Sequence, residues 1–200
     1  MQLLLIRHGE SEADLLDVHE GRADFPLTER GQRQAEKMAA WVTEHYKPDR
    51  LLVSTLQRAR MTAEHLAQAS GCEPEFWPEL MEYNNGARAG LPMEEGFRLH
   101  PDPVHEHERI EGGESRLEFR LRAEAVWSRV QSELKQGERV AIVAHGWMIT
   151  QLIRAILEQP PKSTVYYETG DTGIHLFEWN SKGLVARFMN STAHLAGEEV

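Results

Sequence analysis

Cysteine is nearly absent from this chain, in which Cys72 is the single thiol. One thiol excludes an internal disulfide and a CxxC metal site, and it favours a reducing compartment, so we expect a cytoplasmic protein. Long hydrophobic runs are also missing, because the apolar stretch Leu3–Ile6 is followed at once by charged residues. That stretch is too short for a membrane span or a signal peptide, and we expect neither.

Positive charge is scarce as well. The 22 Lys and Arg residues stand against 32 Asp and Glu residues, which gives a formal net charge of -10 with histidine neutral. This balance opposes the broad basic surface that binds a nucleic-acid backbone, so we expect neither a nucleic acid nor a membrane as partner. A chain of 200 residues can bury an apolar core in a single domain, expected over residues 1–200. A homo-oligomer is compatible with the sequence, which does not indicate one.

Apolar patterning predicts an alternation of strands and helices along the chain. Short apolar runs that are typical of strands buried on both faces lie at 2–6, at 51–54 and within 139–146. Apolar residues at helical spacing predict helices from Thr28 to about Tyr46, over 57–69, over 115–134 and over 148–157. Alternating apolar residues predict an antiparallel hairpin made of 173–180 and 184–190.

The segment from Trp77 to Gly113 lacks this periodicity and contains several proline, glycine and histidine residues. Such a segment favours an irregular, lid-like insertion that lies over the edge of a sheet. The order of the other elements predicts an α/β fold. We expect three α/β/α layers, with helices on both faces of a mixed, mostly parallel sheet.

Two of the predicted strands end in the same dipeptide. The stretches Ile6-Arg7-His8-Gly9 and Val143-Ala144-His145-Gly146 both lead from an apolar strand into a turn. Because the carboxyl ends of parallel strands meet at one edge of a sheet, we expect His8 and His145 to face each other across a crevice. Each glycine allows the backbone to turn tightly and to approach a ligand.

Two arginines are expected in the same crevice, since Arg7 adjoins His8 and Arg58 follows the second strand. Guanidinium groups match the geometry of tetrahedral oxyanions, and the backbone N–H groups near Gly9 add further donors. The combination predicts a site for a phosphoryl group. The residues expected to bind the substrate there are Arg7, Arg58, His145, Ser11 and Gly146.

These residues form part of an ordered series of motifs that covers most of the chain. With this series the chain resembles the histidine phosphatase superfamily, also called the phosphoglycerate mutase-like family. A lone Arg-His-Gly would be weak, whereas several motifs in the same order are specific. The matching residues are Arg7–Ser11, Gly21, Asp24–Gly31, Gln34-Ala35, Ser54, Leu56, Arg58-Ala59, Thr62-Ala63, Glu82, Gly112–Ser115 and Ala144–Gly146.

The resemblance implies a phosphoglycerate mutase-like fold and a particular reaction. It implies that His8 attacks phosphorus and becomes a phosphohistidine, while Arg7, Arg58 and His145 bind the phosphoryl oxygens. It further implies that Glu82 protonates the leaving alcohol and later accepts a proton from water, without a metal or a cofactor. We expect a raised pKa for Glu82, because burial and a bound phosphate both disfavour its charged form. The charge of Arg7 should help to keep His8 neutral.

Hydrolysis of a small-molecule phosphate ester is favoured over phosphoryl transfer. The chain departs from the mutase pattern at 83–88 and is shorter than the mutases, and nothing in it argues for the exclusion of water that transfer needs. Two alternatives stay open, a phosphoglycerate mutase-type transfer and a non-catalytic phosphate-binding regulatory protein. The second is motivated by Asp14 and Glu20, where the family commonly has neutral Asn and Gln, because charged carboxylates there would repel phosphate.

The lid contains three histidines next to acidic residues, His100, His105 and His107. A metal cluster is one interpretation of this pattern. Prolines break the stretch and it offers no second ligand pair on a defined element, so a solvated loop is favoured and we predict no metal site. For the proton donor, Glu82 is preferred to its neighbour Glu79 because of its spacing to the glycine that follows.

Overall fold

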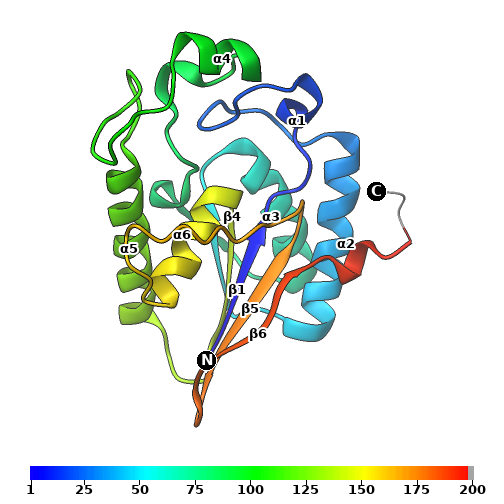
Figure 1. The fold of residues 1–200 in the computed structure, drawn as a ribbon. Helices are drawn as coiled ribbons and strands as arrows, with labels where there is room; N and C mark the ends of the chain where they lie inside the picture. The colour runs from blue at the N-terminus through cyan, green and yellow to red at the C-terminus, as the bar shows by residue number, and fades with distance from the viewer. Residues whose placement is uncertain (198–200) are drawn as a thin grey trace.

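The computed structural model describes residues 1–197 and contains one six-stranded sheet (Figure 1). Its strands are ordered β3-β2-β4-β1-β5-β6 across the sheet. The neighbours β3, β2, β4 and β1 pair in parallel, whereas β5 and β6 are antiparallel to their neighbours, so the sheet is mixed. The strands are β1 (Gln2–Arg7), β2 (Arg50–Ser54), β3 (Pro74–Trp77), β4 (Arg139–Ala144), β5 (Ile174–Asn180) and β6 (Gly183–Ser191).

Helices cover both faces of the sheet, and each face has its own apolar core. Leu3 and Leu5 of β1 pack in the core that contains α5 and α6, whereas Leu4 and Ile6 pack in the core that contains α2 and α3. This alternation confirms the predicted three-layer α/β/α arrangement. The helices are α1 (Glu12–Leu16), α2 (Glu29–Tyr46), α3 (Gln57–Ser70), α4 (Met93–Leu99), α5 (Arg116–Glu133) and α6 (Gly146–Ile156), with short 3-10 turns η1 (Pro78–Leu80), η2 (Gly86–Arg88) and η3 (Ala193–Leu195).

Capping residues in the sequence begin or end three of the helices. The Thr28 side chain accepts a hydrogen bond from Gly31 N at 2.9 Å and begins α2 at the predicted place. Ser115 and Glu118 form a reciprocal capping box that begins α5. Gly71 ends α3 in the left-handed conformation with φ 75°, which a residue without a side chain adopts without strain.

The register of the two central strands positions the candidate site. Arg7 at the end of β1 is paired with Ala144 at the end of β4. The next residue on each strand is a histidine, so His8 and His145 leave the sheet side by side. Gly9 is required at this point, because a Cβ atom there would lie 2.5 Å from the carbonyl oxygen of Gly31 at the start of α2.

Three elements were not predicted from the sequence. The helix α1 is short and polar, β3 is a four-residue edge strand that begins with proline, and α4 lies inside the predicted lid. Local periodicity is too weak in such short elements, and tertiary contacts decide them. The rest of 77–113 consists of single turns and irregular chain, as expected.

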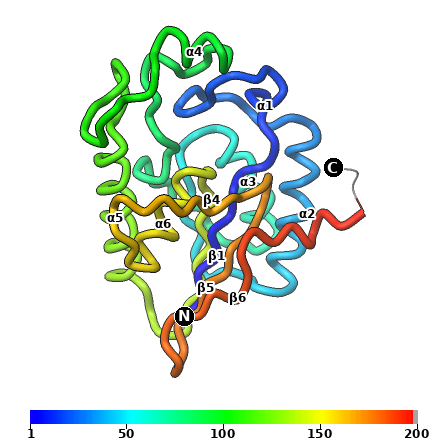
Figure 2. Tube along the Cα trace, in the orientation of Figure 1, coloured from blue at the N-terminus to red at the C-terminus, as the bar shows by residue number. Residues whose placement is uncertain are grey.

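The lid packs on the segment that follows α1 (Figures 1 and 2). The backbone N–H of His19 donates to Leu91 O at 2.8 Å, and the N–H of Gly90 donates to His19 O at 2.8 Å. Both segments lie beyond the carboxyl ends of β1 and β4 in the two views. None of the helices formed by residues 1–197 combines the length and the apolar character needed to cross a membrane.

Candidate active site

His8 and His145 meet at the sheet edge, as the two His-Gly motifs predict. Their ring centroids lie 5.1 Å apart and both side chains are buried. His8 Nδ1 lies 2.8 Å from the carbonyl oxygen of Gly9, and because a carbonyl only accepts, Nδ1 holds the ring proton. Arg58 Nε donates a hydrogen bond to His8 Nε2 at 3.2 Å. Nε2 of His8 therefore carries the lone pair of the ring.

Both imidazoles are held in the neutral form. Burial lowers the pKa of His8 well below its ordinary value, and the charges of Arg58 and Arg7 lower it further. Burial also lowers the pKa of His145 well below its ordinary value, followed by the charge of Arg58. Sequence reasoning expected the charge of Arg7 to help keep His8 neutral, and burial is the larger cause. His145 Nε2 lies 2.7 Å from Ser54 Oγ, and its Nδ1 has no hydrogen-bond partner among the described residues.

Arg58 extends from the first turn of α3 and is fully buried. Its Nη1 donates to Ala23 O at 2.9 Å and its Nη2 donates to Gly21 O at 2.8 Å. These bonds fix the guanidinium beside His8, so its charge is oriented before any ligand arrives.

Arg7 approaches from the end of β1. Its Nη1 donates to Thr169 O at 2.8 Å, and its Nη2 lies 3.4 Å from Asp171 and 3.9 Å from Asp14. Both carboxylate contacts of Arg7 are longer than a strong ion pair. Its guanidinium is therefore only partly neutralised and can still attract an anionic ligand.

Glu82 lies in the loop after η1, and its carboxylate caps the start of α6. Oε1 accepts from Tyr83 N at 2.8 Å and from Met148 N at 3.1 Å, and Oε2 accepts from Trp147 N at 3.0 Å. Burial raises the pKa of this carboxyl, while the backbone donors oppose that effect. The direction is the one expected for a group that must donate a proton near neutral pH.

A cavity of about 470 Å³ opens in front of these groups. We name two parts of it. The floor comprises His8 and Arg7, together with Arg58 and His145, which lie against His8, and the buried Ser11. The mouth comprises Tyr83, Phe97, Trp147 and Tyr166.

The predicted residues take different places relative to this cavity. Arg7, His8, Glu82 and Gly146 line it, whereas Arg58, His145 and Ser11 lie behind the lining. Ser11 Oγ is bonded to Asp14 at 3.0 Å and to Glu20 at 2.5 Å. Its role as a phosphate ligand stays a prediction.

Several lining residues were not identified from the sequence. Tyr166 comes from an irregular loop with no motif, and a Cβ on Gly146 would lie 3.6 Å from its hydroxyl. Arg88 Nη1 lies 2.6 Å from Asp102 Oδ1, and the guanidinium carbon of Arg88 lies 4.7 Å from the centroid of the Phe97 ring. These lid residues come together only in the folded chain. Glu20 was set aside as uncertain, and it lines the cavity.

Glu114 supports the loop that holds Glu82. It pairs with Arg122 at 2.6 Å, and Arg122 in turn donates to the backbone carbonyl of Glu82 at 3.1 Å. In the lid, the rings of His105 and His107 stack at 5.8 Å. Within residues 1–197, no group of three or more His, Cys, Asp or Glu side chains is arranged to hold a metal ion.

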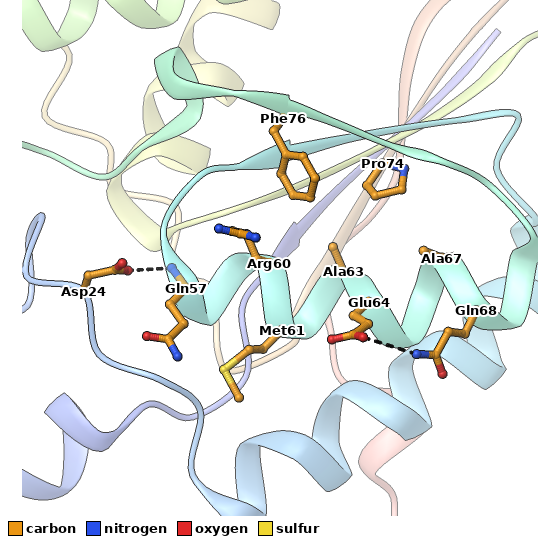
Figure 3. A pocket seen from close by; sticks show the side chains of 10 residues that line it. All are labelled: Asp24, Gln57, Arg60, Met61, Ala63, Glu64, Ala67, Gln68, Pro74 and Phe76. Carbon is orange, nitrogen blue, oxygen red and sulfur yellow. Dashed lines mark hydrogen bonds between the residues drawn. The ribbon is translucent and has the colours of Figure 1, made fainter.

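A second cavity lies along the outer side of α3 and next to the edge strand β3 (Figure 3). Arg60 extends toward Phe76, with its guanidinium carbon 5.2 Å from the ring centroid. Asp24 accepts from Gln57 N at 2.5 Å and caps α3. Neither His8 nor Glu82 lines this cavity, so we place the candidate active site in the histidine-lined one.

The fold and this pair of histidines define an α/β protein of the phosphoglycerate mutase-like type. The chain belongs to the histidine phosphatase superfamily (branch 1), whose family model matches residues 3–192. A relative from Escherichia fergusonii, described as a probable phosphoglycerate mutase GpmB, is 34% identical over 168 residues, which are 80% of this chain and 76% of the relative.

Solved structures give the same fold. A putative alpha-ribazole-5'-P phosphatase from Escherichia coli superposes with a TM-score of 0.82 at 25% identity, covering 96% of this chain and 97% of that one. A phosphoserine phosphatase from Entamoeba histolytica, in complex with 3-phosphoglyceric acid, superposes with a TM-score of 0.78 at 27% identity, covering 97% and 98%. The superfamily members similar to this chain thus include proteins named as phosphatases and proteins named as mutases.

Proposed function

We propose that this protein is a metal-independent phosphatase that hydrolyses a small organic phosphate monoester through a phosphohistidine on His8. The observation that carries the proposal is the tautomer of His8, with the Nδ1 proton held by Gly9 O and the Nε2 lone pair directed away from it. A neutral imidazole with a defined lone pair is the form that attacks phosphorus.

The reaction proceeds in two displacements. First, a bond forms between His8 Nε2 and phosphorus while the ester P–O bond breaks, and the proton of Glu82 passes to the leaving oxygen. Second, water attacks phosphorus and gives a proton to Glu82, the P–N bond breaks, and inorganic phosphate leaves. Burial supports both roles of Glu82, because it raises the pKa of that carboxyl.

The charge on the phosphoryl oxygens is met by protein groups. Arg7 and Arg58 flank His8, and His145 lies 5.1 Å from it between ring centroids. In phosphoryl transfer, positioning and charge stabilisation supply most of the rate enhancement, and oriented guanidiniums provide both. Arg7 and Arg58 would provide the positive charge that a metal ion supplies in other phosphatases, and His145 would add a neutral hydrogen-bonding group.

We prefer hydrolysis to phosphoryl transfer because of the loop after Glu82 and the exposed mouth of the cavity. The segment after Glu82 departs from the mutase pattern, and the mouth residues Trp147 and Tyr166 are 44% and 52% exposed. Water can reach a phosphoenzyme through such a mouth, whereas a mutase must retain the phosphoryl group. The phosphatase names of the two structural relatives agree with this preference.

The direct test uses a chromogenic phosphate ester in the presence of EDTA. We expect phosphate release by the wild type and none above background by His8→Ala. Loss of activity on chelation, or unchanged activity of His8→Ala, contradicts the proposal.

A second assay separates hydrolysis from transfer. With 3-phosphoglycerate as the substrate, a mutase moves the phosphoryl group between hydroxyls and releases little phosphate, whereas a phosphatase releases phosphate. If tetrahedral anions bind but no ester is turned over and no phosphoenzyme forms, a phosphate-binding regulatory protein is the better description.

A further inference from the structure

Glu20 separates the cavity from two of the groups that are proposed to bind phosphate. One carboxylate oxygen of Glu20 lies 3.1 Å from Arg58 Nε and accepts from Ser11 Oγ at 2.5 Å. The other oxygen lies 3.6 Å from His8 Nε2. Glu20 lines the cavity, whereas the side chains of Arg58 and Ser11 are fully buried behind it. A phosphoryl group that approaches His8 therefore meets Glu20.

The carboxylate and a phosphoryl group compete for one place. Attack by His8 requires phosphorus at about 3 to 3.5 Å from Nε2. Glu20 has an oxygen at 3.6 Å from the same atom, close to the region where phosphoryl oxygens would lie. Two anions at such short distance repel strongly in a buried site. Glu20 must be neutral, or move aside, when a phosphoryl group binds.

Ser11 cannot donate to both of the carboxylates that lie beside it. Ser11 Oγ lies within hydrogen-bond distance of Asp14, at 3.0 Å, and of Glu20, at 2.5 Å. A hydroxyl has one hydrogen and can donate to only one of two carboxylates. When both carboxylates are charged, one of them therefore lacks this hydrogen bond, which makes it easier to protonate.

The charged groups that face Glu20 come from three elements. Arg58 of α3 and Arg7 of β1 are cations, Asp14 of α1 is an anion, and His8 is neutral. Burial is the largest influence on Glu20 and raises its pKa, while Arg58 opposes this effect. Glu20 is the less exposed of the two carboxyls, so burial disfavours its charge more, and it is the group that would take up a proton when an anion binds.

We propose that Glu20 couples phosphoryl binding to the uptake of one proton, so that the site accepts a tetrahedral anion together with a proton on Glu20. The neutral carboxyl then donates a hydrogen bond to a phosphoryl oxygen, and Arg58 is released from Glu20 to face the anion. This inference rests on the proposed function only in taking the histidine-lined cavity as the phosphoryl site. In this role, Glu20 makes the affinity of the site for a tetrahedral anion depend on pH.

Sulfate tests the coupling because it keeps its two negative charges across the whole range of pH used. We would measure its dissociation constant by calorimetry from about pH 5 to about pH 8. For the wild type, we expect binding to weaken as the pH rises, by up to about tenfold per pH unit for one proton. Glu20→Gln should bind sulfate about tenfold or more tightly than the wild type at the upper end, with a flatter profile.

A matched control is Glu10→Gln. Glu10 is also a largely buried carboxylate, but it pairs with Arg30 at 3.2 Å and accepts from Thr28 at 2.7 Å. This variant should keep the wild-type dependence on pH. Calorimetry in two buffers of different ionisation enthalpy should give about one proton taken up per sulfate in the wild type, and fewer in Glu20→Gln.

Equal pH dependence in the wild type and Glu20→Gln overturns the inference, as does weaker sulfate binding by Glu20→Gln at high pH with an unchanged melting temperature. If Glu20→Gln unfolds, the proton count of the wild type in the two buffers decides, and a count near zero overturns the inference. The sulfate experiment does not depend on hydrolysis. If the sulfate profiles of the wild type and Glu20→Gln differ but no ester is turned over, the proposed phosphatase activity is refuted and the role of Glu20 stands. If esters are turned over but the two sulfate profiles are equal, the phosphatase activity stands and the role of Glu20 is refuted.

Discussion

The floor and the mouth of the cavity are built in different ways. At the floor, His8, His145 and Arg58 are buried and each is positioned by the end of a strand or the start of a helix. At the mouth, Phe97 and Tyr166 come from the lid and from a loop, and both are about half exposed. The sheet thus fixes the groups that we propose to react, while loops would determine which leaving group can lie beside them.

The two parts differ also in how their polar atoms are held. Arg58 gives its two terminal nitrogens to backbone carbonyls, and the His8 ring proton goes to Gly9 O. Groups that are already oriented need little reorganisation energy during a reaction, and they can therefore stabilise a transition state. The mouth rings contact one another instead, with Trp147 and Tyr83 at 6.0 Å and Trp147 and Tyr166 at 6.4 Å.

After the loss of His8 itself, the largest effect is expected where the floor and the mouth join, at Glu82. Glu82→Gln removes the transferable proton but keeps the side-chain shape, and it should lower kcat on an alkyl phosphate about 100- to 10,000-fold. The loss should be smaller for a nitrophenyl phosphate, because that leaving group needs no proton. Steady-state kinetics on both esters measure this. Glu79→Gln, an exposed neighbour in η1, is the control. Equal losses on both esters contradict the role of Glu82.

A smaller effect is expected at Arg58. Arg58→Lys cannot serve Gly21 O, Ala23 O and His8 together, so kcat/KM should fall about 100-fold and the free energy of unfolding by about 1 to 3 kcal/mol. The matched control is Arg60→Lys, two residues along α3, whose side chain faces the second cavity (Figure 3). Its kinetics and urea unfolding should remain as in the wild type. A similar loss in both variants would assign the effect to the helix and not to the floor.

At the mouth, substitution should change binding more than chemistry. Trp147→Ala should raise KM about tenfold for an ester with a large apolar leaving group and leave kcat within about threefold, because the ring contacts the substrate alike before and during reaction. Leu121→Ala, which truncates an exposed side chain on α5, is the control. A fall in kcat with KM unchanged would mean that the mouth also positions reacting groups.

The smallest effect concerns stability and pH. Burial holds the pKa of His8 and His145 well below their ordinary value, so the unfolded chain takes up protons at about pH 6.5 while the folded one does not. The free energy of unfolding should therefore fall as the pH drops below that value. His145→Gln should reduce the slope between pH 7.5 and pH 5 in urea unfolding, by about one proton. His105→Gln on the exposed lid provides the comparison, and equal slopes for both variants contradict this account.

The sequence predicts the floor far better than the mouth. The His-Gly motifs were found because each ends a buried apolar run, and the register of β1 with β4 brings them together. Glu82 was identified by resemblance to a family, and its spacing to Gly86 was the one local sign that separated it from Glu79. The contact of Glu20 with Ser11 and Arg58 depends on how an irregular loop folds back, and Tyr166 comes from a loop without any periodic signal. Such tertiary contacts have no signature in a single sequence.

The most direct test of the central claim is to stop the reaction during turnover and locate the covalent phosphate. The protein would be mixed with excess ester, quenched in alkali to preserve a phosphoramidate, digested, and examined by mass spectrometry. We predict a phosphoryl group on the peptide that contains His8, attached at Nε2, labile to acid and missing in His8→Ala. A phosphoryl group on any other residue, or rapid turnover with no phosphoenzyme at any time point, would contradict the account.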